Sequence, residues 1–235
     1  MYKKMMAITK QRHRDKKIMQ VNHFGFAGGT YIVSLIANEF NKAASIYPIV
    51  FVKDGSDKLR PFALFGLEKG ENLFVDKDGR WLSHYVPAVI RRYPFVLGRS
   101  ENGTDLILCI DDESGFLSDT QGEPLYDEKG QPGPVMEKAR DYLIELQRHS
   151  ELTNLFSDEL ARHDLLAPLK MQIRNAEGEM VNVDGIFAVN EKKLGELSDE
   201  DFVELRRRGA LQLIYAHLVS LVQMERLVQM KSEKK

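Results

Sequence analysis

Short apolar runs and amphipathic stretches alternate along this chain without the regular strand–helix–strand repeat of a parallel α/β fold. The clearest strands are expected at residues 49–52 and 106–110, where β-branched and other apolar side chains suit a pleated surface. The longest helical pattern covers residues 202–224; it follows a capping-box-like start at Ser198, and Gly209 within it indicates either a break or close backbone packing. The pattern predicts an α+β single domain, with a mixed or largely antiparallel sheet, helices packed on it and a long C-terminal helix.

The remaining elements follow from the same two periodicities, 3.6 residues for helices and 2 for strands. The expected helices are residues 30–44, 87–92, 134–147 and 152–160; the expected strands are residues 60–66, 72–75 and 95–97; and a hairpin is expected from 169–173 and 181–189 around a turn at 175–178.

The start of the chain is strongly basic. Residues 1–20 contain seven Lys or Arg and one Asp, hence a net charge of +6, and because the whole chain carries −2 the remaining residues carry −8. We expect residues 1–20 to form a solvated basic N-terminal arm and residues 21–230 to form one domain, because no Pro- or Gly-rich linker divides them. The only cysteine, Cys109, lies in an apolar run and is interpreted as a buried, inert thiol.

The composition also limits location and partners. No segment approaches the ~18 consecutive apolar residues of a membrane span, and the apolar run at residues 5–8 is too short for a secretory signal. We therefore expect no transmembrane segment and a cytoplasmic protein. The near-neutral total charge disfavours nucleic acid as a partner, although binding through the basic residues 1–17 stays an alternative. The oligomeric state is left open.

Local motifs for common catalytic and cofactor sites are absent from the sequence. It has no phosphate-binding glycine loop, no nucleophile elbow of a serine hydrolase and no convincing pair of metal-binding histidines. The sequence therefore indicates no cofactor and no metal, and it leaves open whether the protein is an enzyme. His217, within the C-terminal helical pattern, is interpreted as a core histidine bonded to a carbonyl.

Three consecutive carboxylates, Asp111 to Glu113, directly follow the strand expected at residues 106–110. Carboxylates at a strand end serve acid–base chemistry when their surroundings separate their pKa values. A solvent-exposed turn explains the same pattern and is the interpretation we favour, because Asp and Glu are rarely buried without a partner.

One segment, residues 81–95, concentrates the only tryptophan, a histidine, two tyrosines and two adjacent arginines. Binding surfaces favour aromatic residues and arginine, and a guanidinium can hold a carboxylate, a phosphate or a sugar acid through two hydrogen bonds. The segment predicts a site for a protein or an anionic small-molecule partner; the alternative is that its aromatic residues are core and its arginines pair with the acidic turns. The candidate binding residues are Trp81, His84, Tyr85, Arg91, Arg92 and Tyr93.

These residues lie within a block that resembles the SapC family of bacterial proteins. The resemblance implies no established activity, cofactor or catalytic residue, but the family name implies a role around surface-layer assembly or export. Similar proteins accompany outer-membrane nutrient-uptake genes in proteobacteria. The matching segments are 47–51, 65–67, 71–81, 85–95, 125–130 and 211–221, which together span about residues 20–228.

Three functional hypotheses follow. The leading one is an intracellular accessory or binding protein for surface-layer or cell-envelope function, with residues 81–95 as its recognition surface. The second is an enzyme with a non-local site, a metal-dependent oxygenase or a transferase, built from Asp111, Asp112, His84 and Arg91. The third is nucleic-acid binding through the basic arm.

Overall fold

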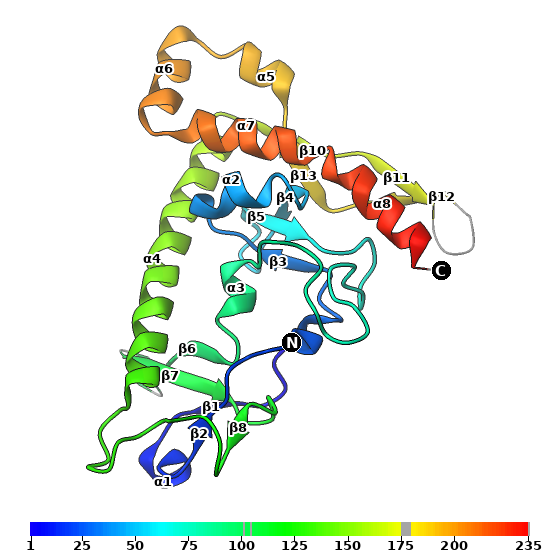
Figure 1. Cartoon of the computed structure of the whole chain (residues 1–235). Coiled ribbons are helices and arrows are strands. Elements are labelled where there is room, and N and C mark those ends of the chain that lie inside the picture. The colour runs from blue at the N-terminus through cyan, green and yellow to red at the C-terminus, as the bar shows by residue number, and fades with distance from the viewer. Residues whose placement is uncertain (101, 104, 175–179, 235) are drawn as a thin grey trace. The chain divides into compact units, whose positions relative to one another are not determined.

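Antiparallel pairing joins all the strands of the described residues, 1–100, 102–103, 105–174 and 180–234, in the computed structural model of the chain (Figure 1). The contacts divide the chain into two units: unit 1 is Met1–Gly29 with Phe74–Arg148, and unit 2 is Thr30–Leu73 with His149–Lys235. The expected α+β class with antiparallel sheets is confirmed.

Unit 1 contains two small sheets. The order of the first is β1-β7-β6, and in the second β2 lies between β8 and β9. The strands are β1 (Met5–Ala7), β2 (Lys17–Ile18), β6 (Phe95–Arg99), β7 (Leu106–Asp111), β8 (Leu117–Ser118) and β9 (Glu123–Pro124); the helices are α1 (Lys10–His13), the 3-10 turn η1 (Gly25–Ala27), α3 (Ala88–Arg91) and the first part of α4 (Pro134–Arg162).

The core of unit 1 gathers residues that lie far apart in the sequence. Tyr93 is 3 % exposed, and its ring stacks on Phe26 with 3.9 Å between the ring centroids. Burial of each large apolar side chain contributes about 1.5–3 kcal/mol, so this cluster is a main source of stability in the unit. Its buried members are Ile18, Tyr93, Phe95, Ile110, Phe116, Leu125, Tyr126, Met136 and Leu143.

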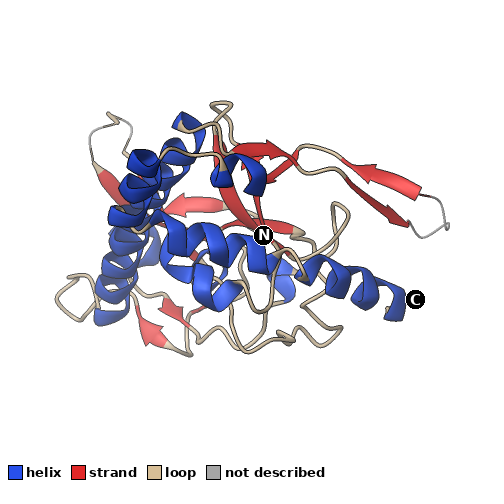
Figure 2. Cartoon of the chain, turned by 90° about the horizontal axis from the view of Figure 1, so that it is seen from above, coloured by secondary structure: helices blue, strands red, loops and turns tan. Residues whose placement is uncertain are grey.

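Unit 2 contains a five-stranded sheet of order β10-β13-β4-β5-β3 and a hairpin of two strands, which extends away from that sheet in Figure 2. The strands of the sheet are β3 (Ile32–Ser34), β4 (Ile49–Lys53), β5 (Leu59–Leu64), β10 (Leu166–Pro168) and β13 (Ile186–Val189), and the hairpin is β11 (Met171–Arg174) with β12 (Met180–Val183). The helices are η2 (Ala37–Glu39), α2 (Phe40–Ala43), the second part of α4, α5 (Glu191–Gly195), α6 (Asp199–Arg207), α7 (Ala210–Ser220) and α8 (Gln223–Glu233).

Helix α7 is attached to this sheet by hydrogen bonds from two buried polar residues. The imidazole of His217 donates from Nδ1 to the carbonyl of Ile49 at 2.8 Å and accepts at Nε2 from the amide of Val189 at 3.0 Å. The hydroxyl of Ser220 accepts from the amide of Ile49 at 2.9 Å. The interpretation of His217 as a core histidine is therefore confirmed.

The helix expected at residues 30–44 is wrong over its first half. Residues Ile32–Ser34 instead form β3, which pairs with β5, and only Phe40–Ala43 is α-helical. Apolar spacing in a short window does not distinguish a helix from a strand, and here pairing with a partner strand decides the outcome. Residues 72–75 also form no strand; only Val75 bridges to Trp81.

The helical expectations near the C-terminus are confirmed with interruptions. Ser198 caps α6 by accepting from the amide of Asp201 at 3.1 Å. Gly209, with φ of 73°, separates α6 from α7, so the break is confirmed at the residue that tolerates this conformation. The helices expected at 134–147 and 152–160 are one helix, α4. The turn expected at residues 175–178 lies outside the described residues.

The basic start of the chain forms secondary structure, while Lys3, Lys4, Lys10, Arg12 and Arg14 are exposed to solvent. Its residues supply β1, α1 and β2 to unit 1, where β1 pairs with β7 and the side chain of His13 is buried. The division into an arm at 1–20 and a single domain at 21–230 stays a prediction. No helix in the described part of the chain combines the length and the apolar character that crossing a membrane requires.

Candidate functional site

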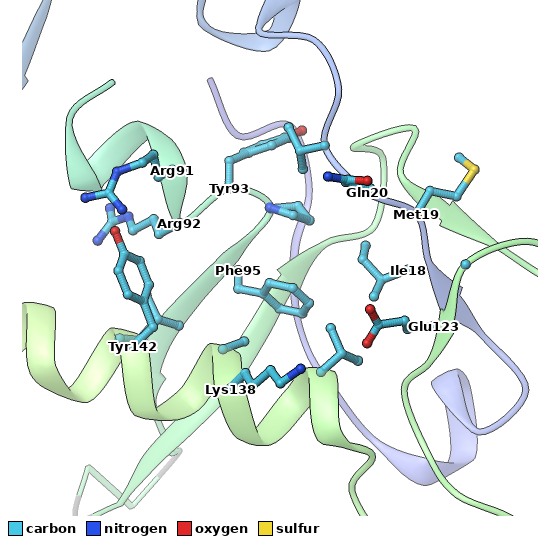
Figure 3. Close-up of a pocket in the computed structure, with 16 residues that line it drawn as sticks. Ile18, Met19, Gln20, Arg91, Arg92, Tyr93, Phe95, Glu123, Lys138 and Tyr142 are labelled. Carbon is cyan, nitrogen blue, oxygen red and sulfur yellow. The ribbon is translucent and has the colours of Figure 1, made fainter. Parts of the chain in front are cut away.

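A cavity of about 630 Å³ opens in unit 1 beside the segment that carries the two arginines (Figure 3). This volume lies in the range of pockets that bind small molecules. Its walls are residues 18–21, residues 91–95, residues 122–123 and one face of α4.

The α4 wall follows directly from helical geometry. Val135, Lys138, Ala139, Tyr142 and Leu143 line the cavity, and they recur at spacings of three and four residues. Residues at these spacings lie on one face of a helix. Most are apolar, so the sequence predicts the helix face but does not distinguish a cavity wall from a packed core.

Arg91 is the last residue of α3, and one hydrogen bond and one cation–π contact position its side chain at the cavity. Its Nε donates to the carbonyl of Val86 at 2.9 Å, and its Cζ lies 5.6 Å from the centroid of the Tyr142 ring. The hydroxyl of Tyr142 in turn donates to the carbonyl of Ala88 at 3.2 Å, which joins α4 to α3. The guanidinium plane is thus oriented while its terminal nitrogens stay available at the cavity.

Arg92 is held in the same way by the start of the chain. Its Nε donates to the hydroxyl of Tyr2 at 3.2 Å, and its Cζ lies 5.9 Å from the centroid of that ring. The Tyr2 hydroxyl also donates to the carbonyl of Phe95, at 3.3 Å. Burial raises the pKa of Tyr2 and the Arg92 charge opposes the rise, so the phenol stays protonated and can donate.

The charges at the cavity are mostly positive. Arg91, Arg92 and Lys138 contribute three cations, and Glu123 contributes one carboxylate. Among the residues that the structure describes, none of the three cations forms an ion pair with a carboxylate. The alternative in which Arg91 and Arg92 pair with the acidic turns is therefore not observed in that part of the chain. An anion that enters the cavity would meet unneutralised donors.

The other candidates from residues 81–95 do not all reach this cavity. Tyr93 lines it, whereas Trp81, His84 and Tyr85 do not. The indole of Trp81 donates to the hydroxyl of Ser83 at 2.9 Å and to the carbonyl of Tyr85 at 3.1 Å, which fixes the loop around it. The structure thus brings three of the six predicted residues together.

Several lining residues were not predicted from the sequence. Lys138 could have been noticed in the sequence, because it is a cation on an otherwise apolar face of a predicted helix. Glu123 and Gln20 had none, because they lie in short segments that only tertiary pairing brings to the cavity.

The turn after β7 is solvent-exposed only in part: Glu113 is exposed, so the interpretation that we favoured holds there and is wrong for Asp111 and Asp112. The carboxylate of Asp111 is fully buried and accepts hydrogen bonds from the amides of Lys3 and Lys4 at 3.0 and 2.8 Å. Asp112 lies 3.0 Å from Nε2 of His13 and 2.5 Å from Nη2 of Arg12. Buried carboxylates require hydrogen-bond donors, and for both of these the start of the chain supplies donors.

The set of residues suggested for an enzyme is therefore not assembled as one site. Among the described interactions, none joins Asp111 or Asp112 to His84 or Arg91. The first two hold the N-terminal segment, His84 is exposed, and Arg91 lines the cavity.

Glu159, His163 and Glu204, among the described residues of unit 2, form a cluster with the composition of a metal site. Arg162 lies 2.6 Å from a carboxylate oxygen of Glu159 and 3.1 Å from one of Glu204, and Arg208 lies 2.6 Å from Glu204. Two guanidinium groups already neutralise the carboxylates, so the arrangement is an ion-pair network between α4 and α6. A cation would have to displace the arginines.

The comparisons with known proteins assign a family and no activity. The model of the family described as SapC matches residues 8–227, which is most of the chain. No curated protein and no solved structure matches the chain.

Proposed function

The chain belongs to the SapC family, and we propose that it is an accessory binding protein that captures an anionic group between Arg91 and Arg92. We further propose that it works in the cytoplasm in support of surface-layer or cell-envelope function. The family name supports this association, and the cavity supports the binding role.

One observation carries the proposal. Two adjacent guanidinium groups line the same cavity, each is oriented through its Nε, and no described carboxylate forms an ion pair with either. Charge-assisted hydrogen bonds from arginine to a carboxylate or phosphate are among the strongest in proteins. An arginine pair that is already oriented loses little side-chain entropy when it binds an anion.

The two other hypotheses have weaker support. Enzymatic chemistry through Asp111 and Asp112 conflicts with the hydrogen bonds that already occupy both carboxylates. Nucleic-acid binding through the basic arm is weakened because three of its seven cations, Lys4, Arg12 and Lys16, already pair with acidic residues of unit 1.

The experiment is a titration of the full-length protein with benzoate, followed by the NMR signals of the arginine Nε–H groups. We expect saturable shifts of the Arg91 and Arg92 signals. The double substitution Arg91→Ala, Arg92→Ala is expected to remove saturable binding. Arg91→Lys, Arg92→Lys is expected to retain part of it, because lysine keeps the positive charge but cannot donate two parallel hydrogen bonds to one acidic group.

The matched control is Arg140→Ala, Arg148→Ala, which removes two exposed cations of α4 that do not line the cavity. It is expected to bind benzoate like the wild type. Thermal unfolding of all variants separates loss of binding from loss of fold. Unchanged binding by the Arg91, Arg92 double-alanine variant, with the fold intact, refutes the proposal.

A further inference from the structure

The charged groups of the cavity lie at its two ends rather than throughout it. Figure 3 shows Arg91, Arg92 and the hydroxyl of Tyr142 on one side of Phe95, and Glu123 on the other. Lys138 extends from α4 toward the same side as Glu123. The cavity therefore has a cationic end and an end that carries both signs of charge.

The wall between the two ends is apolar. Phe95 lies in the middle of the cavity in Figure 3, and Ile18, Val135, Ala139 and Leu143 also line it. An apolar wall favours a ligand with an apolar body, since removing apolar surface from water contributes about 25 cal/mol per Å². A phosphate-rich or sugar-like body would lose its hydration there without gaining hydrogen bonds.

The two ends differ in the kind of group that they suit. At the cationic end the terminal nitrogens of Arg91 and Arg92 make no hydrogen bond to any described residue, and they match the oxygens of one acidic group. At the other end a second acidic group would meet Glu123, whose charge offsets that of Lys138. A neutral hydroxyl or amide can donate to Glu123 and accept from Lys138, so it suits that end better.

We infer that the ligand is an amphiphilic monoacid: one carboxylate or phosphate at Arg91 and Arg92, an apolar body along Phe95, and an uncharged polar group at Lys138 and Glu123. This inference rests on the proposed function and specifies its ligand. The apolar body can be an aliphatic chain or a ring, because both bury apolar surface.

The test is isothermal titration calorimetry of the full-length protein with four aliphatic probes. 10-Hydroxydecanoate has the three proposed features, decane-1,10-diol lacks the acid, acetate lacks the body, and decanedioate replaces the neutral end by a second acid. We expect 10-hydroxydecanoate to bind at least about tenfold more tightly than each of the other three. A fifth probe, 4-(4-hydroxyphenyl)butanoate, distinguishes an aromatic body from an aliphatic one.

Two substitutions test the separate parts. Glu123→Gln removes the repelling carboxylate and is expected to tighten decanedioate binding toward that of 10-hydroxydecanoate. Ala139→Leu fills the apolar wall and is expected to weaken both hydroxy acids while leaving acetate unchanged.

The outcomes separate this inference from the proposed function. If acetate binds as tightly as both hydroxy acids, and its binding requires Arg91 and Arg92, the amphiphilic ligand is refuted and anion capture stands. If no acid requires the arginines, both proposals fail. Equal binding of decanedioate and 10-hydroxydecanoate in the wild type refutes the inference that the ligand places an uncharged polar group at Lys138 and Glu123.

Discussion

The carboxylate of Asp111 accepts a hydrogen bond of 2.9 Å from the hydroxyl of Tyr93, the residue that directly follows Arg91 and Arg92. Because Asp111 also accepts from the amides of Lys3 and Lys4, one buried carboxylate joins the start of the chain to the cavity segment. Lys3 and Lys4 therefore support the candidate site structurally, although they do not line it.

Asp111→Ala is expected to lower the free energy of unfolding by about 3 kcal/mol, because it leaves the Tyr93 hydroxyl and three amides without their acceptor. Urea unfolding at pH 7 measures the loss. Asp119→Ala, which removes an exposed carboxylate paired with Lys16, is the control and is expected to change stability by less than about 1 kcal/mol. Equal effects of the two substitutions contradict the structural role of Asp111.

The contribution of Asp111 also has a defined pH dependence. Burial alone raises the pKa of Asp111, but hydrogen bonds from Lys3, Lys4 and Tyr93 outweigh it, so the pKa lies below the ordinary 3.8. A lowered pKa means that the stabilisation is complete above pH ~4 and decreases as the pH falls through the folded-state value. The stability difference between wild type and Asp111→Ala is therefore expected to shrink below pH 4.

Tyr2→Phe tests whether the start of the chain orients Arg92. The substitution keeps the ring beside the guanidinium and removes the hydroxyl that accepts from Nε. The lost hydrogen bond to Arg92, of about 1 kcal/mol, predicts benzoate binding weaker by roughly fivefold. The hydroxyl also donates to the carbonyl of Phe95, so the free energy of unfolding is expected to fall by about 1–2 kcal/mol. Tyr215→Phe, which removes an exposed hydroxyl of α7, is the control. Unaltered affinity in Tyr2→Phe excludes this orienting role.

The sequence predicted those strands that are runs of apolar side chains. β4 and β7 are such runs, and periodicity with β-branched composition was enough to find them. β3 was missed because it has three residues, and its conformation depends on pairing with β5, a segment about thirty residues away. Local spacing contains no information about that partner.

The site was partly predictable for the same reason. Arg91, Arg92 and Tyr93 are neighbours in the chain, so their composition was visible. Tyr2 reaches Arg92 only because β1 pairs with β7, and Lys138 reaches the cavity only because α4 lies beside β6. These are long-range relationships that residue spacing does not encode.

His217 is expected to make stability depend on pH between about 6.5 and 4. Burial lowers the pKa of His217 to about 4, and its bond to the Ile49 carbonyl opposes this only in part. The unfolded state, with an ordinary pKa of 6.5, then binds more protons in this window, so stability decreases as the pH falls. The slope approaches about 1.4 kcal/mol per pH unit.

Urea unfolding at pH 7.0, 5.5 and 4.5 measures this slope, and His217→Gln provides the comparison because an amide cannot titrate in the range. The variant is expected to be less stable at pH 7 and to show a shallower slope. Parallel curves for the two proteins would show that other groups cause the pH dependence.

Gly122→Ala tests the close approach that forms one wall of the cavity. Gly122 has φ of 102°, and an added Cβ would overlap the carbonyl oxygen of Ile18 in β2. Gly115 has φ of 80° with open space around it, so Gly115→Ala measures the cost of the backbone conformation alone, about 1–2 kcal/mol. We expect Gly122→Ala to cost at least about 2 kcal/mol more, because overpacking adds to the backbone cost.

Since Gly122 and Ile18 both line the cavity, benzoate binding is expected to weaken in Gly122→Ala and not in Gly115→Ala. Equal unfolding free energies in urea for the two variants would show that β9 moves away from β2 without cost.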